Sequence, residues 1–157
     1  MSIERVRKYF DKFGIADRIL EFDVSSATVA LAAEAVGCEP QRIAKTLSFS
    51  VSTQTILIVA AGDARVDNRK YKERFGAKAK MLTPAEAETL IGHAVGGVCP
   101  FAVNEGINIY LDESLKRFET VFPACGSSNS AIELTIPELE KYSDFVEWVD
   151  VCKISEN

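Results

Sequence analysis

Apolar and polar residues follow two different periods along this chain, and each period predicts one kind of element. Near the N-terminus, Ile3, Val6, Phe10 and Phe13 recur at helical spacing, so we expect an amphipathic first helix. Further on, apolar residues alternate with polar ones or form short unbroken runs, as they do in strands. These runs predict strands over residues 19–24, 45–51, 55–61, 107–111, 120–122, 132–136 and 145–151.

Start and stop signals place helices between these strands. Ser25 and Ser26 can cap an alanine-rich helix that ends near Gly37. Further signals are Pro40 in a short helix, Asp67 and Gly76 around a basic helix, the capping box Thr83-Pro84-Ala85-Glu86 before a helix reaching Ile91, Pro137 at a helix start, and a short strand over 80–82. About seven strands mixed with four or five helices, without regular alternation, predict an α+β fold whose mixed sheet curls toward a barrel.

Length and composition predict one soluble domain. With 157 residues, of which 47% are hydrophobic, the chain can bury one full core, and we expect a single domain over residues 1–157. No run of about 18 apolar residues is present, and the charged N-terminal segment lacks the apolar region of a signal peptide. We therefore expect a cytoplasmic protein with no membrane partner.

Lys45 stands at the head of a strand whose other members of the same parity are apolar. Leu47, Phe49 and Val51 share its side, because side chains alternate across a strand with period two. Its ammonium group should point toward an apolar interior or the mouth of one, where an anionic or carbonyl partner has to offset the lost hydration. A ligand could supply that partner. Alternatively, a lysine at a strand end packs its stem and extends its charge to water.

Two loops rich in glycine and small polar residues add candidate binding groups. Gly96-Gly97-Val98-Cys99-Pro100 presents consecutive backbone N–H groups with little obstruction, and such a loop can bind an oxyanion or a carbonyl oxygen. Gly126-Ser127-Ser128-Asn129 can form hydrogen bonds with a ribose or an amino group. Both patterns also occur in ordinary turns, so neither alone establishes a site.

Other catalytic and metal-binding arrangements are poorly supported. The four cysteines are widely spaced and His93 is the one histidine, which argues against a zinc site and a disulfide framework. No serine or cysteine is evidently paired with His93, and a helix-end role is favoured for it. Cys99 could be a nucleophile inside the glycine loop, although buried packing is the favoured interpretation. Neither a Walker A loop nor a dinucleotide-binding pattern is present, and no metal or cofactor is expected.

The charge of the chain limits its possible partners. A net charge of -5 disfavours a protein that wraps a long nucleic acid, and DNA is not expected as a partner. The charge is uneven, because residues 65–80 carry seven basic side chains against two acidic ones. This patch could hold one short anionic segment, such as the end of an RNA, or it could be a solvated helix face. The candidate contacts are Arg65, Arg69, Lys70 and Lys72.

Several short motifs, taken together and in order, resemble the YbaK/ProX family. Its members are aminoacyl-tRNA deacylases related to the editing domain of bacterial prolyl-tRNA synthetases. The resemblance runs from about Ile15 to Tyr142. The motifs that carry it are Ile43-Ala44-Lys45-Thr46-Leu47, Gly62-Asp63, Gly76-Ala77-Lys78, Val95-Gly96-Gly97-Val98-Cys99-Pro100-Phe101, Leu111-Asp112 and Gly126-Ser127-Ser128-Asn129.

This resemblance implies an ester hydrolase that acts on the acceptor end of mischarged tRNA. The family's lysine matches Lys45, which would hold the terminal adenosine or the ester region. The family's GxxxP loop matches Gly96 through Pro100, and N–H groups near Gly97 would bind the substrate carbonyl. The expected catalytic residues are Lys45, Gly96, Gly97, Val98 and Pro100. The residues expected to bind the substrate are Phe22, Ser26, Thr28, Thr46, His93, Gly126, Ser127, Ser128 and Asn129.

The resemblance leaves the amino acid open among alanine, serine, threonine and cysteine, with a proline tRNA as the expected carrier. Two other hypotheses remain at this point. The chain could be a non-catalytic module that binds a tRNA acceptor end or an aminoacyl-nucleotide ligand, or it could be a thiol hydrolase built on Cys99. The sequence predicts no oligomeric state.

Overall fold

The computed structural model describes residues 2–94 and 96–154. Its α-helices are α1 (Ser2–Asp11), α2 (Val29–Val36), α3 (Asn68–Phe75), α4 (Pro84–Ile91) and α5 (Ile136–Ser143), and its 3₁₀ helices are η1 (Ala16–Arg18), η2 (Pro40–Arg42) and η3 (Glu113–Arg117). Its strands are β1 (Leu20–Glu21), β2 (Ile43–Val51), β3 (Gln54–Ala61), β4 (Ala64–Val66), β5 (Asn108–Asp112), β6 (Thr120–Pro123), β7 (Ser130–Ala131), β8 (Leu134–Thr135), β9 (Glu147–Val149) and β10 (Cys152–Ile154).

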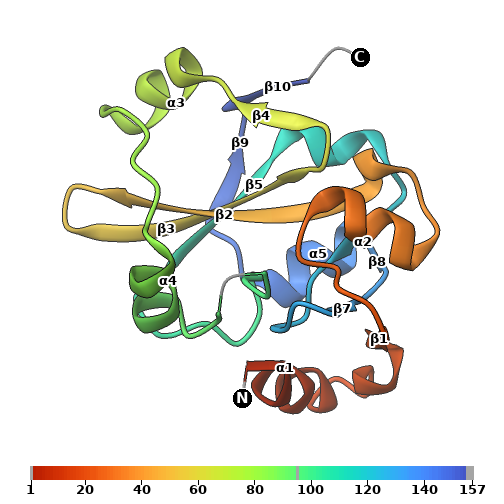
Figure 1. Ribbon diagram of the computed structural model, residues 1–157. Coiled ribbons are helices and arrows are strands. Elements are labelled where there is room, and N and C mark those ends of the chain that lie inside the picture. The colour runs from red at the N-terminus through yellow and green to blue at the C-terminus, as the bar shows by residue number, and fades with distance from the viewer. Residues whose placement is uncertain (1, 95, 155–157) are drawn as a thin grey trace.

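A mixed sheet with the strand order β8-β6-β2-β3-β5-β9 forms the centre of the molecule. The predicted hairpin of β2 and β3 is its longest antiparallel ladder, running from Val51 opposite Gln54 to Ala44 opposite Ala61. Parallel pairs join β2 to β6, β3 to β5 and β5 to β9. In Figure 1 the hairpin crosses the molecule, with α3 above one end of it, α4 below, and α2 and α5 toward the other end. The α+β class and the curled mixed sheet are confirmed.

Apolar packing against this sheet forms the main core. β3 is buried from Ile56 to Ala61, so it carries apolar side chains on both of its faces. Helix α1 adds Val6 and Phe10, both fully buried, and the Phe10 ring lies 4.8 Å from that of Phe101. A smaller apolar cluster packs α2 against Ile43 at the start of β2.

Local signals located several helix ends correctly. Asp67 accepts hydrogen bonds from two amides at the start of α3, and Gly76 ends that helix with a positive φ of 76°. The capping box of Thr83 and Glu86 is present at the start of α4. At α2, however, the cap is Thr28, whose hydroxyl accepts from the Leu31 amide, so the predicted caps at Ser25 and Ser26 are wrong.

Several strand predictions were wrong in extent. The strand expected over 19–24 is reduced to the two residues of β1, and residues 80–82 make an isolated bridge to Phe49. The alternating residues 132–136 divide between β8 and α5, because Thr135 and Glu138 form a capping box that begins a helix at Ile136. The last predicted strand, over 145–151, is shortened to β9. The sequence analysis missed β4 and β10, which pair with each other.

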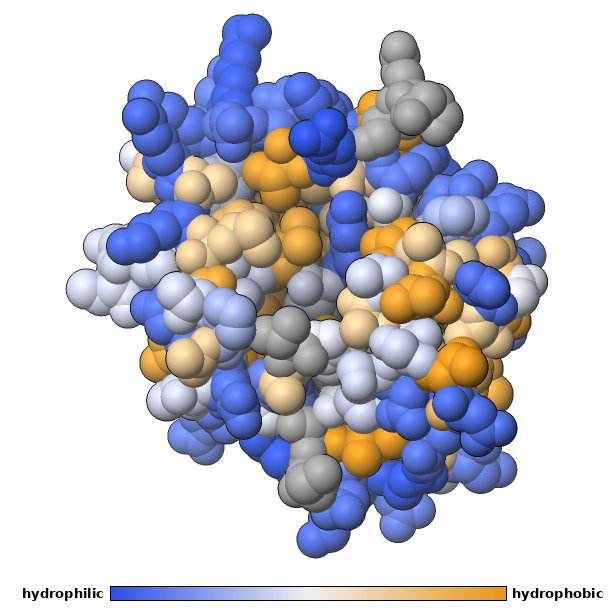
Figure 2. Space-filling model, viewed as in Figure 1, coloured by the Kyte–Doolittle hydropathy of each residue, from blue (hydrophilic) through white to orange (hydrophobic). Residues whose placement is uncertain are grey.

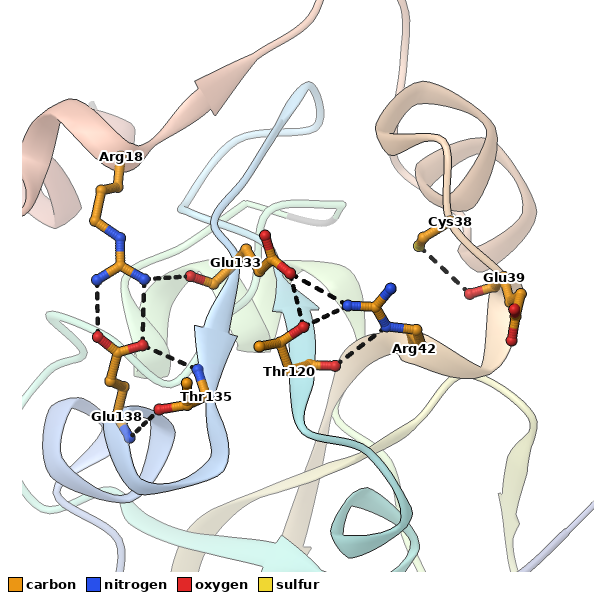
Figure 3. A network of polar contacts seen from close by, with 8 residues as sticks. All are labelled: Arg18, Cys38, Glu39, Arg42, Thr120, Glu133, Thr135 and Glu138. Carbon is orange, nitrogen blue, oxygen red and sulfur yellow. Dashed lines mark hydrogen bonds and ion pairs between the residues drawn. The ribbon is translucent and has the colours of Figure 1, made fainter.

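A polar network fixes the point at which β2 begins (Figure 3). Arg42 donates to the Thr120 carbonyl at 3.3 Å, also contacts the Thr120 hydroxyl, and forms an ion pair with Glu133 at 3.2 Å. Nearby, Arg18 makes two hydrogen bonds to Glu138, and this contact lowers the pKa of Glu138 to about 2. These contacts tie η2, and therefore the strand that follows it, to β6 and to the residues before β8.

Candidate active site

The candidate site lies where one edge of β2 has no neighbouring strand. β6 pairs with β2 only at Ile43 and Ala44, and residues 80–82 form backbone bonds with β2 from Ser48 onward. Backbone hydrogen-bonding groups alternate in direction along a strand, so those of Thr46 point toward the gap between these two partners. One edge of β2 is therefore open between Ala44, where pairing with β6 ends, and Ser48, where bonding to residues 80–82 begins.

A cavity of about 310 Å³ lies at this open edge. Its walls come from α2, α4, β2, β6, β7 and the loops between these elements, and Figure 2 shows the hollow near the centre of this face of the molecule. Among the predicted catalytic and substrate-binding residues, the structure brings together six in its lining: Ser26, Thr28, Lys45, Thr46, Gly96 and Val98. The volume is within the range of small-molecule sites.

Lys45 lines this cavity and is half-buried. Its Nζ lies 3.5 Å from the carbonyl oxygen of Gly62. Burial lowers the pKa of Lys45, Cys152 and Asp63 oppose that change, and the positive charge of Arg65 adds to it. The ammonium group is therefore held inside the protein boundary, close to a carbonyl partner.

Asp63, although close to Lys45, is bound by another residue. Arg117 holds its carboxylate with two hydrogen bonds, of 2.6 and 3.1 Å, and these keep the pKa of Asp63 below its usual range. Among the described residues, Lys45 Nζ donates a hydrogen bond to the Gly62 carbonyl and to no carboxylate. The positive charge at Lys45 is therefore not neutralised by a direct ion pair and can attract an electron-rich group of a substrate.

The glycine loop reaches the cavity through Gly96 and Val98, whereas Gly97 and Pro100 do not line it. The Gly97 amide donates to the Ala94 carbonyl at 3.0 Å, which corrects the expectation of a free N–H group there. No hydrogen bond among the described residues uses the Val98 amide. Val95, the first residue of the motif, lies outside the described residues. Val98 therefore brings to the cavity lining a backbone amide that has no partner among the described residues.

Gly97 contributes close packing between two loops. A Cβ at Gly97 would lie 2.6 Å from the carbonyl carbon of Gly126 and 2.6 Å from the amide nitrogen of Ser127. At Gly96, which has a φ of 88°, a Cβ would lie 3.1 Å from that of Ser128. The absence of side chains here lets the glycine loop lie directly against residues 126–128.

The second polar loop binds mainly to the segment before α2. Ser128 accepts hydrogen bonds at its carbonyl from the Ser26 amide at 2.6 Å and from the Ser26 hydroxyl at 3.2 Å. Phe22 and Asn129 exchange two hydrogen bonds, of 2.8 and 3.0 Å. The Ser127 hydroxyl bonds to the side chains of Asn129 and Ser130. None of the five predicted residues Phe22, Gly126, Ser127, Ser128 and Asn129 lines the cavity. Ser128 and Ser127 instead bond to Ser26 and Ser130, which do line it.

Hydroxyl groups give the cavity a polar side. Thr46 is notable because its Oγ1 is buried and has no hydrogen-bond partner among the described residues. A buried hydroxyl without a partner is costly to the fold, so Thr46 has hydrogen-bonding capacity that a bound ligand can use. Apolar residues make up much of the rest of the lining, among them Val29, Ile43 and Ala44. The sequence analysis missed four of the apolar lining residues because they belong to no motif: Ala32, Phe122, Ala124 and Ala131.

His93 and Cys99 lie in the interior, away from the cavity lining. Both are fully buried, and His93 Nε2 lies 2.8 Å from the Phe101 carbonyl and 3.6 Å from Cys99 Sγ. Burial raises the pKa of the Cys99 thiol to about 12 and lowers that of His93. A neutral buried thiol is not a nucleophile, which removes the support for a Cys99 hydrolase, and His93 is not placed to touch a substrate in this cavity.

The predicted RNA-binding cations lie outside the cavity, around α3. Lys70 bonds to Asp150 and to the Cys152 carbonyl, both at 3.0 Å, so its charge is largely occupied. Arg69 forms an exposed ion pair with Glu73 at 3.2 Å. The remaining two predicted contacts, Arg65 on β4 and Lys72 on α3, are exposed.

The cavity therefore combines the Lys45 cation, the unengaged amide of Val98, the unengaged buried hydroxyl of Thr46 and small apolar residues. A cation and an N–H group placed around a carbonyl can stabilise the oxyanion that forms when water attacks an ester. Of the helices in residues 2–94 and 96–154, none has the length and apolar character needed to cross a bilayer.

Comparison with known proteins points to the same chemistry. The chain is 54% identical over 154 residues to the uncharacterized protein YwhH of Bacillus subtilis strain 168, covering 98% of each. It matches a crystal structure of a candidate trans-editing enzyme for prolyl-tRNA synthetase with a TM-score of 0.86 and 30% identity over 97% of both chains. It is 26% identical over 118 residues to a proline–tRNA ligase of Geobacillus sp. strain WCH70, spanning 20% of that ligase.

A family model described as an aminoacyl-tRNA editing domain matches residues 24–142. These boundaries include all six of the predicted residues that line the cavity. The chain therefore belongs to the aminoacyl-tRNA editing domain family, and its enzymatic class is that of the aminoacyl-tRNA deacylases, which hydrolyse an ester bond.

Proposed function

We propose that the protein acts in trans to remove a small amino acid, alanine, serine, threonine or cysteine, from mischarged tRNA(Pro). The observation that carries the proposal is the meeting of Lys45 and Val98 in one cavity of about 310 Å³. Similarity to a candidate trans-editing enzyme for prolyl-tRNA synthetase, over nearly the whole of both chains, supports the choice of tRNA.

In this proposal the cavity holds the aminoacyl ester of the terminal adenosine. Lys45 and the Val98 amide bind the carbonyl oxygen, which becomes an oxyanion when a water molecule adds to the carbonyl carbon. A ribose hydroxyl of the substrate assists deprotonation of that water. The ester C–O bond then breaks, and the ribose oxygen takes the proton that the water gives up. The products are the free amino acid and uncharged tRNA, and no protein nucleophile is required.

The lining also supports a small amino acid. Ala32, Ala44, Ala124 and Ala131 contribute to the wall, and the pyrrolidine ring of proline is larger than the side chains of alanine and serine. Steric exclusion of the cognate prolyl group would prevent hydrolysis of correctly charged tRNA, because discrimination can rest on what does not fit.

A panel of charged tRNAs tests this function. Single-turnover rates are measured on tRNA(Pro) carrying alanine, serine, threonine or cysteine, with prolyl-tRNA(Pro) as the cognate control. We expect hydrolysis of at least one small aminoacyl ester and protection of the prolyl ester. Inactivity toward every small ester would reject the proposal, and tight binding of the acceptor end without cleavage would favour the non-catalytic module instead.

A further inference from the structure

A second hollow lies beside the cavity, between α3 and the segment that follows it. Its lining consists of Asn68, Arg69, Lys72, Glu73, Lys78 and Ala79, and we name it the lysine groove. The upper part of the face in Figure 2, over α3, is covered by hydrophilic residues, whereas an apolar area surrounds the central hollow below it. The two hollows therefore differ in character, because charged residues line the groove and mainly apolar and hydroxyl-bearing residues line the cavity.

One short segment separates the lysine groove from the cavity. Ala79 lines the groove, and Met81, two residues later, lines the cavity. Two residues of chain span at most about 7 Å, so the two linings approach each other within that distance. Residues 80–82 are held in place by backbone bonds to Ser48 and Ser50 of β2. The groove is therefore within reach of the next few nucleotides of a strand whose last nucleotide occupies the cavity.

The charge of the groove is positive and incompletely neutralised. Lys72 and Lys78 have no ion-pair or hydrogen-bond partner for their side chains among residues 2–94 and 96–154, and both are exposed. Within the groove, the carboxylate of Glu73 forms an ion pair with Arg69, so it does not neutralise either lysine. By contrast, the neighbouring Lys70 and Arg74 form ion pairs with Asp150 and Glu147. On a chain of net charge -5, two unneutralised lysines beside the cavity form a local site for an anion.

We propose that the lysine groove binds the phosphodiester backbone of the tRNA acceptor strand immediately before its terminal adenosine. The inference rests on the proposed function, because it requires the aminoacylated adenosine to lie in the cavity. Lysine acts as a point charge toward phosphate, so the groove holds the strand through its backbone and does not read its bases. The proposed phosphate contacts are Lys72 and Lys78. This pair differs from the set expected from the sequence, which was Arg65, Arg69, Lys70 and Lys72.

The test removes both lysines and compares a long substrate with a short one. The Lys72→Ala/Lys78→Ala variant is assayed on alanyl-tRNA(Pro) and on 3′-O-alanyl-adenosine, which has no phosphate. We expect kcat/KM on the tRNA to fall on the order of tenfold at 0.1 M salt, and the rate on the adenosine ester to stay unchanged. If serine proves to be the preferred amino acid in the panel above, seryl esters replace the alanyl ones.

A direct binding measurement makes the result independent of hydrolysis. Anisotropy of a fluorescent acceptor-stem minihelix ending in CCA gives Kd between 50 and 200 mM salt. Losing two single-strand phosphate contacts should reduce the slope of log Kd against log salt by about 1.4. Between 50 and 200 mM salt, the Kd of the variant should therefore rise about sevenfold less than that of the wild type. The Lys8→Ala/Lys12→Ala variant is the matched control, since it removes two exposed lysines, one in α1 and one directly after it, and α1 lies at the opposite end of the molecule from α3 (Figure 1).

Two results would overturn the inference. In the first, the groove variant keeps the wild-type salt slope and the wild-type kcat/KM on tRNA. In the second, it loses activity equally on the tRNA and on the adenosine ester, which would place the lysines in the cavity chemistry or the fold. If the wild-type protein hydrolyses no ester at all, the proposed function fails, and the minihelix slope still decides whether the lysines bind phosphate.

Discussion

The Nζ atom of Lys45 lies 3.5 Å from the carbonyl oxygen of Gly62, and that oxygen is fixed in place by tight backbone packing. A Cβ at Gly62 would lie 2.0 Å from the Pro40 carbonyl oxygen and 2.8 Å from Val29 Cγ1, so only glycine fits between η2 and α2. Since Asp63 is bound by Arg117, the Gly62 carbonyl orients the ammonium group without cancelling its charge. The arrangement leaves a partly desolvated cation for the substrate.

Replacing this cation should abolish most activity and leave the fold intact. In Lys45→Met the apolar stem stays and the charge is lost, and we expect the deacylation rate to fall about 10²- to 10³-fold, as when one oxyanion-stabilising donor is removed. Because burial lowers the pKa of Lys45, the charged form is disfavoured by its surroundings, so the melting temperature should not fall. Single-turnover kinetics and thermal melting followed by circular dichroism measure both effects. A rate unchanged in this variant would remove Lys45 from the mechanism.

Adding one methyl group at Gly97 should separate the two loops that support the cavity. The new Cβ would lie 2.6 to 2.7 Å from backbone atoms of Gly126 and Ser127, which cannot yield as a flexible side chain would. For Gly97→Ala we expect a loss of stability of about 1 to 3 kcal/mol and a lower kcat/KM, measured by urea unfolding and by deacylation. Gly106→Ala is the control, since a Cβ at Gly106 would meet no atom within 4 Å and its cost comes only from the positive φ of 86°. Equal effects at both positions would contradict the packing role.

The elements that the sequence predicted well depend on short-range chemistry. Asp67, Gly76 and the pair Thr83 and Glu86 act on backbone groups within four residues, so their role can be deduced without knowing the fold. The side of β2 on which Lys45 lies is also fixed locally, because side chains alternate from one residue of a strand to the next. The gap beside Thr46 is different, because it depends on where β6 stops pairing with β2, and these strands are far apart in sequence.

The glycine loop shows the same limit at the level of one atom. From Gly96 and Gly97 we predicted backbone N–H groups that are free to bind a ligand. In the structure the loop turns back, and the Gly97 amide donates to the Ala94 carbonyl. Likewise, alternation over 132–136 could not show that Thr135 caps a helix, since both patterns share the same apolar positions. The wall of small apolar residues was missed because alanines carry no signal until strands and helices bring them together.

Thr46 offers a test that separates function from stability. Its Oγ1 is buried without a partner, so Thr46→Val removes an unsatisfied polar group and keeps the shape of the side chain. We expect the free energy of unfolding to stay constant or rise by about 1 to 3 kcal/mol, while kcat/KM falls about tenfold because a hydrogen bond to the substrate is lost. Thr53→Val, in the exposed turn of the hairpin, should change neither quantity. Full activity in the Thr46 variant would mean that this hydroxyl does not bind the substrate.

Cys99 should be dispensable for catalysis. It is fully buried, its pKa is raised to about 12 by desolvation, and it does not line the cavity. Cys99→Ala should therefore deacylate within about twofold of the wild-type rate, at a stability cost of about 1 kcal/mol for the small void left behind. Cys38→Ala, at a partly exposed cysteine, serves as the comparison. Loss of hydrolysis in a folded Cys99→Ala protein would revive the thiol mechanism.

His93 should make the stability of the protein depend on pH below neutrality. Burial lowers its pKa, the Phe101 carbonyl raises it in part, and the charge of Arg5 lowers it further. Since Nδ1 is buried without a partner, Nε2 carries the proton that is donated to Phe101. A second proton would have no acceptor.

The sign of this effect follows from the lowered pKa. The unfolded chain binds a proton at His93 near pH 6.5, whereas the folded protein does so only at a lower pH. The contribution of His93 to stability is therefore fully present above about pH 6.5 and decreases as the pH falls below that value. We expect the urea midpoint to drop between pH 7.5 and pH 5.5 by more in the wild type than in His93→Gln, which keeps a donor but cannot titrate. Because the chain has one histidine, the difference between the two proteins isolates this group, and an equal drop in both would show that His93 is not held neutral by the fold.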